Sequence, residues 1–287
     1  MARDIIDDRL IGALHVRALS RAGLQHDSVD EHVAVQAGTL AALMEGGYDG
    51  DATLAEILNL GDLGLGTVQH LDGELIVLDG AAWAARADGR VDTLDGSVRT
   101  PFAVVCRFRP TASVHCEGPW TLVEVQDQID RVARSGATAP ADAIVAVRAT
   151  GRFTDLRLRS VARQHPPYAP LRDVVAHQTE WHVDSAVGTV VGFRFPDAIA
   201  GVEVPGHHLH FLSDDRATGG HVIDLTMLDG DVQVQTCDDL HVELPAGVSL
   251  GTPGAVDRDD VQRVEGGHGG PVDAASGAAT DPRRPPR

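Results

Sequence analysis

The sequence predicts an α+β (α/β two-domain) protein in which mixed and antiparallel sheets are flanked by helices. Apolar residues recur at helical spacing in only a few short stretches, and much of the remaining chain alternates apolar and polar residues as a half-buried strand does. Asp-Gly pairs at residues 72–73, 79–80 and 88–89 separate such stretches and are typical of hairpin turns. The chain shows no regular succession of strand and helix, which a parallel βαβ fold would require.

Spacing and capping residues predict the helices. A helix is expected within residues 1–24, which have an apolar face, and a second one ends before Gly46-Gly47, a pair suited to a C-cap. A third is expected within 51–58, where Asp51 or Thr53 can cap a helix. Apolar residues at helical spacing predict a fourth within 121–136, and a short fifth within 167–178 follows a loop limited by proline.

Strands are expected between and after these helices. Residues 67–89 form hairpins, residues 100–110 form a strand that buries Cys106, and residues 143–161 form two strands around Gly151. The last part of the folded chain is a run of strands with tight turns, within residues 187–196, 206–215, 220–228 and 231–245.

The change from helix and strand to strand alone predicts two domains, with a boundary near residues 165–180. Before them lies a helical extension, and after them a Gly, Pro and Ala-rich tail whose composition is typical of disorder. The expected units are residues 1–29, 30–172, 173–267 and 268–287.

Composition excludes several classes of function. The formal charge of −18 argues against binding to nucleic acid or to an anionic membrane surface. All 24 basic Lys or Arg positions are Arg, which excludes a Schiff-base lysine, a lysine anchoring pyridoxal phosphate and a P-loop. The three cysteines form no CxxC pair, as expected of a protein of the reducing cytoplasm.

The stretch GHHLHFLSDDRATGGHV, residues 206–222, is the strongest candidate for a site. Side chains alternate along a strand, so His208 and His210 project to one face and His207 to the other. If the chain returns in register after the turn, His221 joins them. Three imidazoles suit Zn²⁺, or another divalent transition metal, and leave room for a substrate.

Two other interpretations of this stretch stay open on the residues alone. A solvated polar hairpin needs no metal. A cupin-type metalloprotein, such as an iron oxygenase or a metal-dependent binding module, would use the H-x-H pair with Asp214 and a later histidine, for which His241 is available.

Three segments together resemble the α-acetolactate decarboxylase family. They are LGDLGLGTVQHLDGELIVLDG (60–80), GRFTDLRLRSVARQHPPYAPL (151–171) and GTVVGFRFPDAIAGVEVPGHHLHFLSDDRATGGHVIDL (188–225). The similarity runs from about residue 33 to 250, with a fainter extension to 267.

The resemblance implies a cytoplasmic zinc enzyme, commonly a dimer, that converts 2-acetolactate, a small 2-hydroxy-3-keto acid, to acetoin and CO₂. It implies zinc on His208, His210 and His221, and a zinc site on a hairpin of the C-terminal domain. Further site residues implied by the family are Arg159, Glu74, Thr67 and Glu265.

The chemistry of this reaction agrees with those residue types. Loss of CO₂ leaves electrons that the neighbouring ketone must accept, and a Lewis-acid metal can stabilise the resulting enediolate where no lysine or thiamine does so. A guanidinium matches a carboxylate at two points. The residues alone do not choose between Arg157 and Arg159, and only the family spacing favours Arg159. A carboxyl group, for which Glu74 is the candidate, can deliver the proton that carbon needs.

Overall fold

The computed structural model describes residues 32–135, 143–199 and 202–243. Its larger sheet has seven strands in the order β15, β1, β8, β3, β4, β5 and β6. The pairing of β1 with β15 is parallel and the others are antiparallel, so this sheet is mixed. Its strands are β1 (Val33–Ala37), β3 (Leu63–Thr67), β4 (Glu74–Leu78), β5 (Ala81–Ala85), β6 (Val91–Thr93), β8 (Phe102–Cys106) and β15 (Asp239–Glu243).

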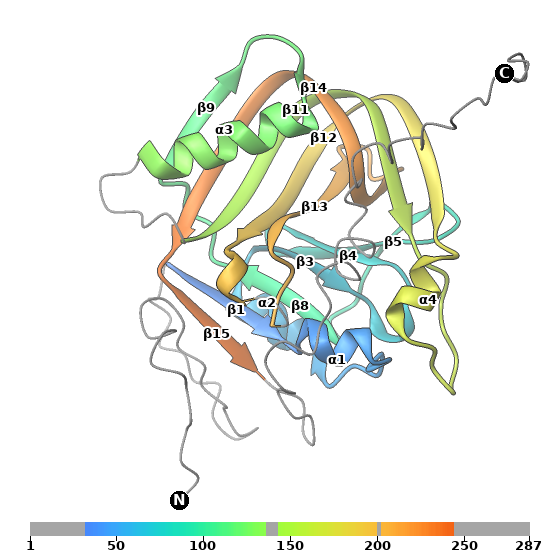
Figure 1. Cartoon of the computed structure of the whole chain (residues 1–287). Coiled ribbons are helices and arrows are strands. Elements are labelled where there is room, and N and C mark those ends of the chain that lie inside the picture. The colour runs from blue at the N-terminus through green and yellow to red at the C-terminus, as the bar shows by residue number, and fades with distance from the viewer. Residues whose placement is uncertain (1–31, 136–142, 200–201, 244–287) are drawn as a thin grey trace, which may run out of the picture.

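The second sheet has six antiparallel strands, three of which are long and strongly bent (Figure 1). β14 pairs with both β11 and β13, and this closes the order β14, β11, β12, β13 into a ring. The strands are β9 (Ala112–Cys116), β10 (Trp120–Thr121), β11 (Ile144–Ser160), β12 (Thr179–Phe195), β13 (Gly206–Ser213) and β14 (Gly219–Cys237). β2 (Ala52–Thr53) and β7 (Arg99–Thr100) form a separate small pair.

Short helices cover the sheets. Thr53 caps the N-terminus of α2 (Leu54–Leu60) with a capping box. Its hydroxyl accepts from the Glu56 amide, and the Glu56 carboxylate accepts from the Thr53 amide. The amphipathic α3 lies across the outer face of β9, β14 and β11 (Figure 1). The helices are α1 (Leu40–Met44), α2 (Leu54–Leu60), α3 (Leu122–Ser135) and α4 (Leu171–Val175), with 3₁₀ turns η2 (Gln69–Leu71) and η3 (Asp197–Ile199).

The main core lies between the two sheets. Leu65 of β3 and Ile76 of β4 pack there with Val191 and Phe193 of β12 and Leu212 of β13. Leu209 and Phe211 belong to the core on the opposite face of β13, under α3. Even-numbered side chains of β13 therefore point toward the larger sheet.

The structure confirms the mixed and antiparallel sheets, the three Asp-Gly hairpins and the buried strand of Cys106. The expected break at Gly151 is wrong, because β11 runs through it without interruption. The separate strands expected at 220–228 and 231–245 are also wrong in part, since β14 continues through Gly230 and only β15 stands apart.

The expected domain division after residue 172 stays a prediction. The two sheets divide the chain differently, since β11 precedes this residue and pairs with β12 and β14 beyond it, while β15 returns to the first sheet. The N-terminal extension 1–29, the tail 268–287 and Glu265 lie outside the described residues.

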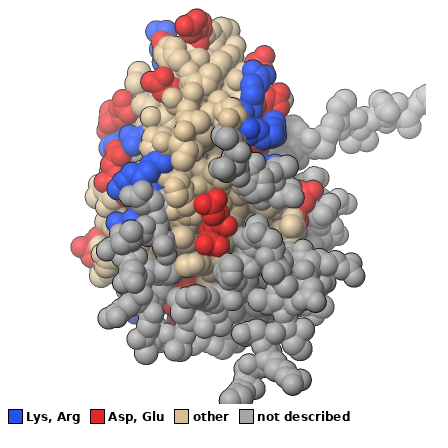
Figure 2. Space-filling model, turned by 90° about the vertical axis from the view of Figure 1, so that its left-hand side faces the viewer, with Lys and Arg blue, Asp and Glu red and all other residues tan. Residues whose placement is uncertain are grey.

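On the face shown in Figure 2, charged side chains of both signs flank a mostly uncharged central area that contains an acidic group. Within the described ranges, no helix has the length and apolar character that a membrane span requires.

Candidate metal centre and active site

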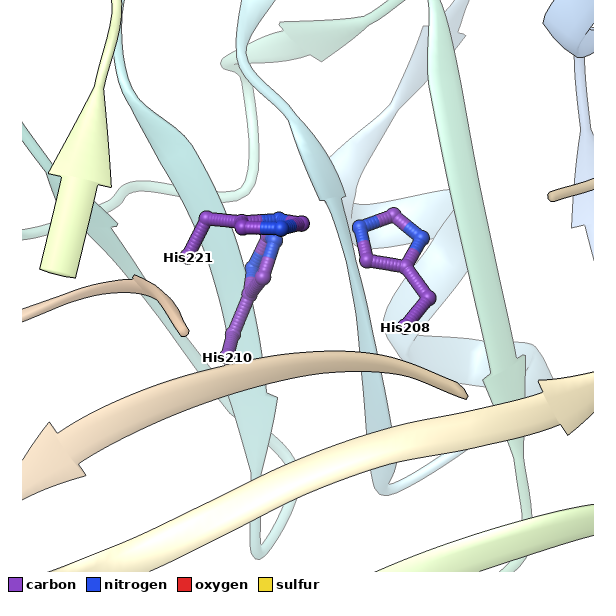
Figure 3. Close-up of side chains that lie close together, drawn as sticks. All are labelled: His208, His210 and His221. Atoms are coloured by element: carbon purple, nitrogen blue, oxygen red, sulfur yellow. The ribbon is translucent and has the colours of Figure 1, made fainter. Parts of the chain in front are cut away.

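Three histidine side chains converge between the sheets (Figure 3). His208 and His210 are two residues apart on β13 and so share a face. His221 on β14 is the direct cross-strand partner of His210. A candidate ligand nitrogen of each ring lies within 4.8 Å of the others. The turn at residues 214–218 thus sets the register that brings the third imidazole to the first two.

Burial keeps the imidazoles of His208 and His210 neutral. His210 is fully buried, and His208 and His221 are 7% and 3% exposed. Burial, with a smaller contribution from the positive charge of Arg159, lowers the pKa of His208 to about 3. The pKa of His210 is also well below its ordinary value, again chiefly because of burial. A neutral imidazole is the form that binds a metal.

A hydrogen bond orients the ring of His210 for metal binding. Its Nδ1 lies 2.9 Å from the carbonyl oxygen of Leu75 on β4, to which it donates. Nε2 must then carry the lone pair, and among the described residues it has no hydrogen-bond partner. A buried lone pair beside two other imidazoles fits a divalent transition metal such as zinc.

Two further strands bring charged groups to the histidines. Glu74 begins β4 and is the cross-strand partner of Thr67 at the end of β3. Arg159 on β11 is paired with His221. Glu74 Oε1 lies 4.0 Å from Arg159 Nη1, and its Oε2 lies 3.6 Å from His210 Nε2. Glu74 and Arg159 are both buried, so their charges interact strongly.

These groups line a pocket that is partly open to solvent and whose empty space, open solvent included, is about 480 Å³. The rest of its lining is apolar, and α1 and α4 contribute Leu40, Leu43, Leu171 and Val175 to it. The cavity therefore offers cationic and acidic groups beside a surface for alkyl groups. Its polar lining consists of Thr67, Glu74, Arg159, His208 and His221, and its further apolar lining of Gly66, Leu71, Phe102, Val161 and Val204.

The structure brings together six of the seven residues singled out from the sequence, and Glu265 lies outside the described residues. Arg157 is half exposed, and its Nη2 lies 3.2 Å from Glu180 Oε2. Of the two arginines only Arg159 lines the cavity, and it pairs with His221, whereas Arg157 pairs with Asp224 farther along β14.

The residues of the cupin interpretation do not join the site. His241 lies on β15 and pairs with Val35 in the larger sheet, and Asp214 is exposed in the turn. His207 points to the opposite side of β13, where its Nε2 lies 3.5 Å from Asp130 of α3.

Sequence reasoning missed Glu203. This carboxylate is fully buried, and its Oε1 lies 3.7 Å from His208 Nδ1. One signal was available, since Glu203 is a lone charge between two valines just before the histidine strand. An acidic residue inside an apolar segment is unusual unless it has a partner.

The chain is similar in sequence to proteins of one family. Residues 35–250 match the model of the family described as alpha-acetolactate decarboxylase. The chain is 39% identical to the alpha-acetolactate decarboxylase of Methylococcus capsulatus, over 75% of this chain and 81% of that one. It is 37% identical to that of Methanosarcina mazei, over 75% and 73%.

A solved structure shares the fold. The alpha-acetolactate decarboxylase from Bacillus subtilis strain 168 superposes with a TM-score of 0.75 and 31% sequence identity, covering 82% of this chain and 99% of the other. A family match over most of the sequence and a shared fold over most of the structure lead to one conclusion. The chain belongs to the alpha-acetolactate decarboxylase family.

Proposed function

We propose that this protein decarboxylates 2-acetolactate to acetoin and CO₂ with a zinc ion held by His208, His210 and His221. The observation that carries the proposal is the convergence of three buried imidazoles beside a cavity that Arg159 and Glu74 also line. Other divalent transition metals fit the same donors. Bound there, zinc would supply a Lewis acid for the negative charge that develops on oxygen when CO₂ leaves.

Arg159 binds the substrate carboxylate in this account. Its planar fork matches two carboxylate oxygens, and burial strengthens the attraction. As CO₂ departs, the electron pair of the broken carbon–carbon bond moves into the adjacent ketone and forms an enediolate. The guanidinium remains close enough to stabilise that charge, which a fixed buried cation does without reorganisation.

Glu74 is the proton donor in this account. Decarboxylation of the anion consumes one proton, which must reach the carbon that lost CO₂. The Glu74 carboxyl group lies between Arg159 and His210, at 4.0 Å and 3.6 Å, and lines the cavity. A carboxyl group placed beside the reacting carbon can deliver that proton and recover it from solvent.

The remaining site residues position the substrate. Thr67 lines the cavity beside Glu74, and its hydroxyl donates to Gly73 O at 3.2 Å, which fixes the side chain. The apolar side chains that line the cavity, among them those of α1 and α4, accommodate the two methyl groups of the substrate. We assign Glu265 the role of a second carboxylate at the pocket, on the strength of the family resemblance alone.

We further propose that the protein works in the cytoplasm as a homodimer. The support for the compartment is that all three cysteines are free and buried. The support for the dimer is the family resemblance.

The test is decarboxylation of 2-acetolactate by the purified protein, with acetoin and CO₂ both measured. His210→Ala should abolish zinc binding and product formation. His182→Ala, on the exposed part of β12, is the matched control and should retain both. Equal activity in wild type and His210→Ala would disprove the proposal.

A further inference from the structure

Glu203 is the one fully buried carboxylate among the described residues, and it stands against a candidate metal ligand. Its Oε1 is 3.7 Å from Nδ1 of His208, the ring nitrogen on the side of the imidazole away from a metal bound through Nε2. Burying an ionised carboxylate is costly unless a group nearby needs its charge. His208 and the metal it would hold are such groups.

The backbone holds Glu203 in this place. The carbonyl oxygen of the preceding residue, Val202, accepts from Gln36 Nε2 at 2.7 Å and from the Leu40 amide at 3.0 Å. The Glu203 amide donates to the Ile199 carbonyl oxygen at 3.1 Å. Gln36 is itself fully buried on β1. The backbone that carries Glu203 is therefore anchored to β1 and α1, while the imidazole that its carboxylate faces belongs to β13 of the second sheet.

Neutral imidazole carries one proton, and a ring that ligates through Nε2 carries it on Nδ1. That N–H needs an acceptor, which fixes both the tautomer and the orientation of the ring. His210 meets this need with the Leu75 carbonyl oxygen at 2.9 Å. Glu203 occupies the corresponding place for His208, where a carboxylate can supply negative charge in place of a carbonyl dipole.

The charges of the buried site also indicate that Glu203 supports metal binding. A divalent cation at the histidines would lie near the Arg159 guanidinium, which already adds one positive charge. The described carboxylates that face this group are Glu74 and Glu203. With both ionised, a divalent metal and Arg159 leave one net positive charge, which the carboxylate of a monoanionic substrate neutralises. Without Glu203, two positive charges would remain in a buried place, where the metal would bind less tightly.

We infer that Glu203 is a positioning residue for the metal centre: its carboxylate, facing His208 Nδ1 at 3.7 Å, favours the tautomer with the proton on Nδ1 and strengthens His208 as a ligand. This inference rests on the proposed metal-dependent function and extends it to a carboxylate that does not line the cavity.

The experiment measures the zinc dissociation constant of Glu203→Gln by competition with a chromophoric chelator. The amide keeps the size of the side chain but removes the charge, and it can donate to Nδ1 and favour the wrong tautomer. We expect a zinc affinity lower by roughly 10 to 100-fold, the usual effect of losing such a partner. Glu203→Asp should keep part of the affinity, because the charge remains while the contact lengthens.

Two controls separate positioning from general support of the fold. Asp130→Asn neutralises the carboxylate that faces His207, the neighbouring histidine on the other side of β13, and should leave zinc affinity unchanged. Thermal unfolding of the metal-depleted proteins should show Glu203→Gln at least as stable as wild type, because a buried charge has been removed.

Wild-type zinc affinity in Glu203→Gln would overturn the inference and leave the histidine site standing. A loss of affinity that merely follows a loss of stability in the metal-depleted protein would overturn it as well, and so would an equal loss in Asp130→Asn. If the wild-type protein itself binds no zinc, the proposed function fails and this inference fails with it.

Discussion

At the scale of single residues, spacing singled out the three histidines as candidates but did not by itself establish a metal site. Alternation along a strand predicted that His208 and His210 share a face, and the double glycine indicated where the return strand begins. Spacing could not choose Arg159 over Arg157, because that choice depends on which of them pairs with His221 across β11 and β14. Nor could it reveal Glu203, whose contact with His208 depends on how Val202 is anchored to β1 and α1.

Arg159→Lys tests the two-point recognition of the carboxylate. An ammonium is a compact point charge and cannot reproduce the fork, so kcat/KM should fall about 100 to 1,000-fold while zinc content is kept. Arg157→Lys is the matched control on the same strand, and its kcat/KM should stay near wild type because this residue contacts Glu180 outside the cavity. The opposite pattern would move the role to Arg157.

The burial of His208 predicts how pH changes the stability of the metal-depleted protein. Its pKa is about 3 when folded and about 6.5 when unfolded, so between these values the unfolded chain binds the extra proton. Stability should therefore fall as pH falls from 6.5 toward 3, by up to about 1.4 kcal/mol per pH unit from this group.

Urea unfolding of chelated wild type and of His208→Gln, at pH values from 7.5 to 5, measures this effect. The variant lacks the titrating group, so its stability should fall less steeply below pH 6.5. Parallel pH dependence in the two proteins would show that His208 does not stay neutral when folded.

At the scale of elements, the sequence predicted the Asp-Gly turns correctly but broke the long strands β11 and β14 at glycines. The Asp-Gly pairs between residues 72 and 89 do turn the chain. Gly151 and Gly230 do not, because they are cross-strand partners inside β11 and β14. A Cβ on Gly151 would lie 2.1 Å from Asp229 O, and one on Gly230 would lie 2.2 Å from Thr150 O. These glycines permit close approach of two backbones, which sequence alone cannot distinguish from a turn.

Gly66→Ala should disturb the site through β3. A Cβ there would lie 2.2 Å from Phe102 O and 2.7 Å from Ala103 Cα, so β3 must move away from β8 and carry Thr67 with it. We expect a loss of about 1–3 kcal/mol in the free energy of unfolding, together with a lower kcat/KM. Gly118→Ala, whose Cβ would have no neighbour within 4 Å, is the control for urea unfolding and kinetics. Equal stability of the two variants would contradict this account of the β3–β8 contact.

At the scale of the whole molecule, the site lies where two sheets face each other. The larger sheet supplies Thr67 and Glu74, and the second sheet supplies Arg159 and the three histidines. Local patterns predicted the strands but not their pairing across the chain, which joins β1 to β15 and β11 to β14. These contacts depend on packing between distant segments, so the cavity and its apolar wall of α1 and α4 could not be foreseen.

The C-terminal segment offers a second test at this scale. If Glu265 acts at the pocket, truncation after Gly267 should leave decarboxylation nearly intact. Truncation after Arg258 removes Glu265 and should abolish turnover while the histidines still bind zinc. Full activity in the shorter protein, or an equal loss in both, would remove Glu265 from the proposed site.

The central claim is that zinc at the three histidines is required for decarboxylation, and one titration tests it most directly. Metal-depleted protein is titrated with zinc, and acetoin formation from 2-acetolactate is measured at each addition. We predict no activity at the start, a linear rise with zinc, and a sharp end to that rise at about one zinc per chain, as a single three-histidine site requires. Full activity in the metal-depleted protein, or a rise that does not saturate near this ratio, would contradict the claim.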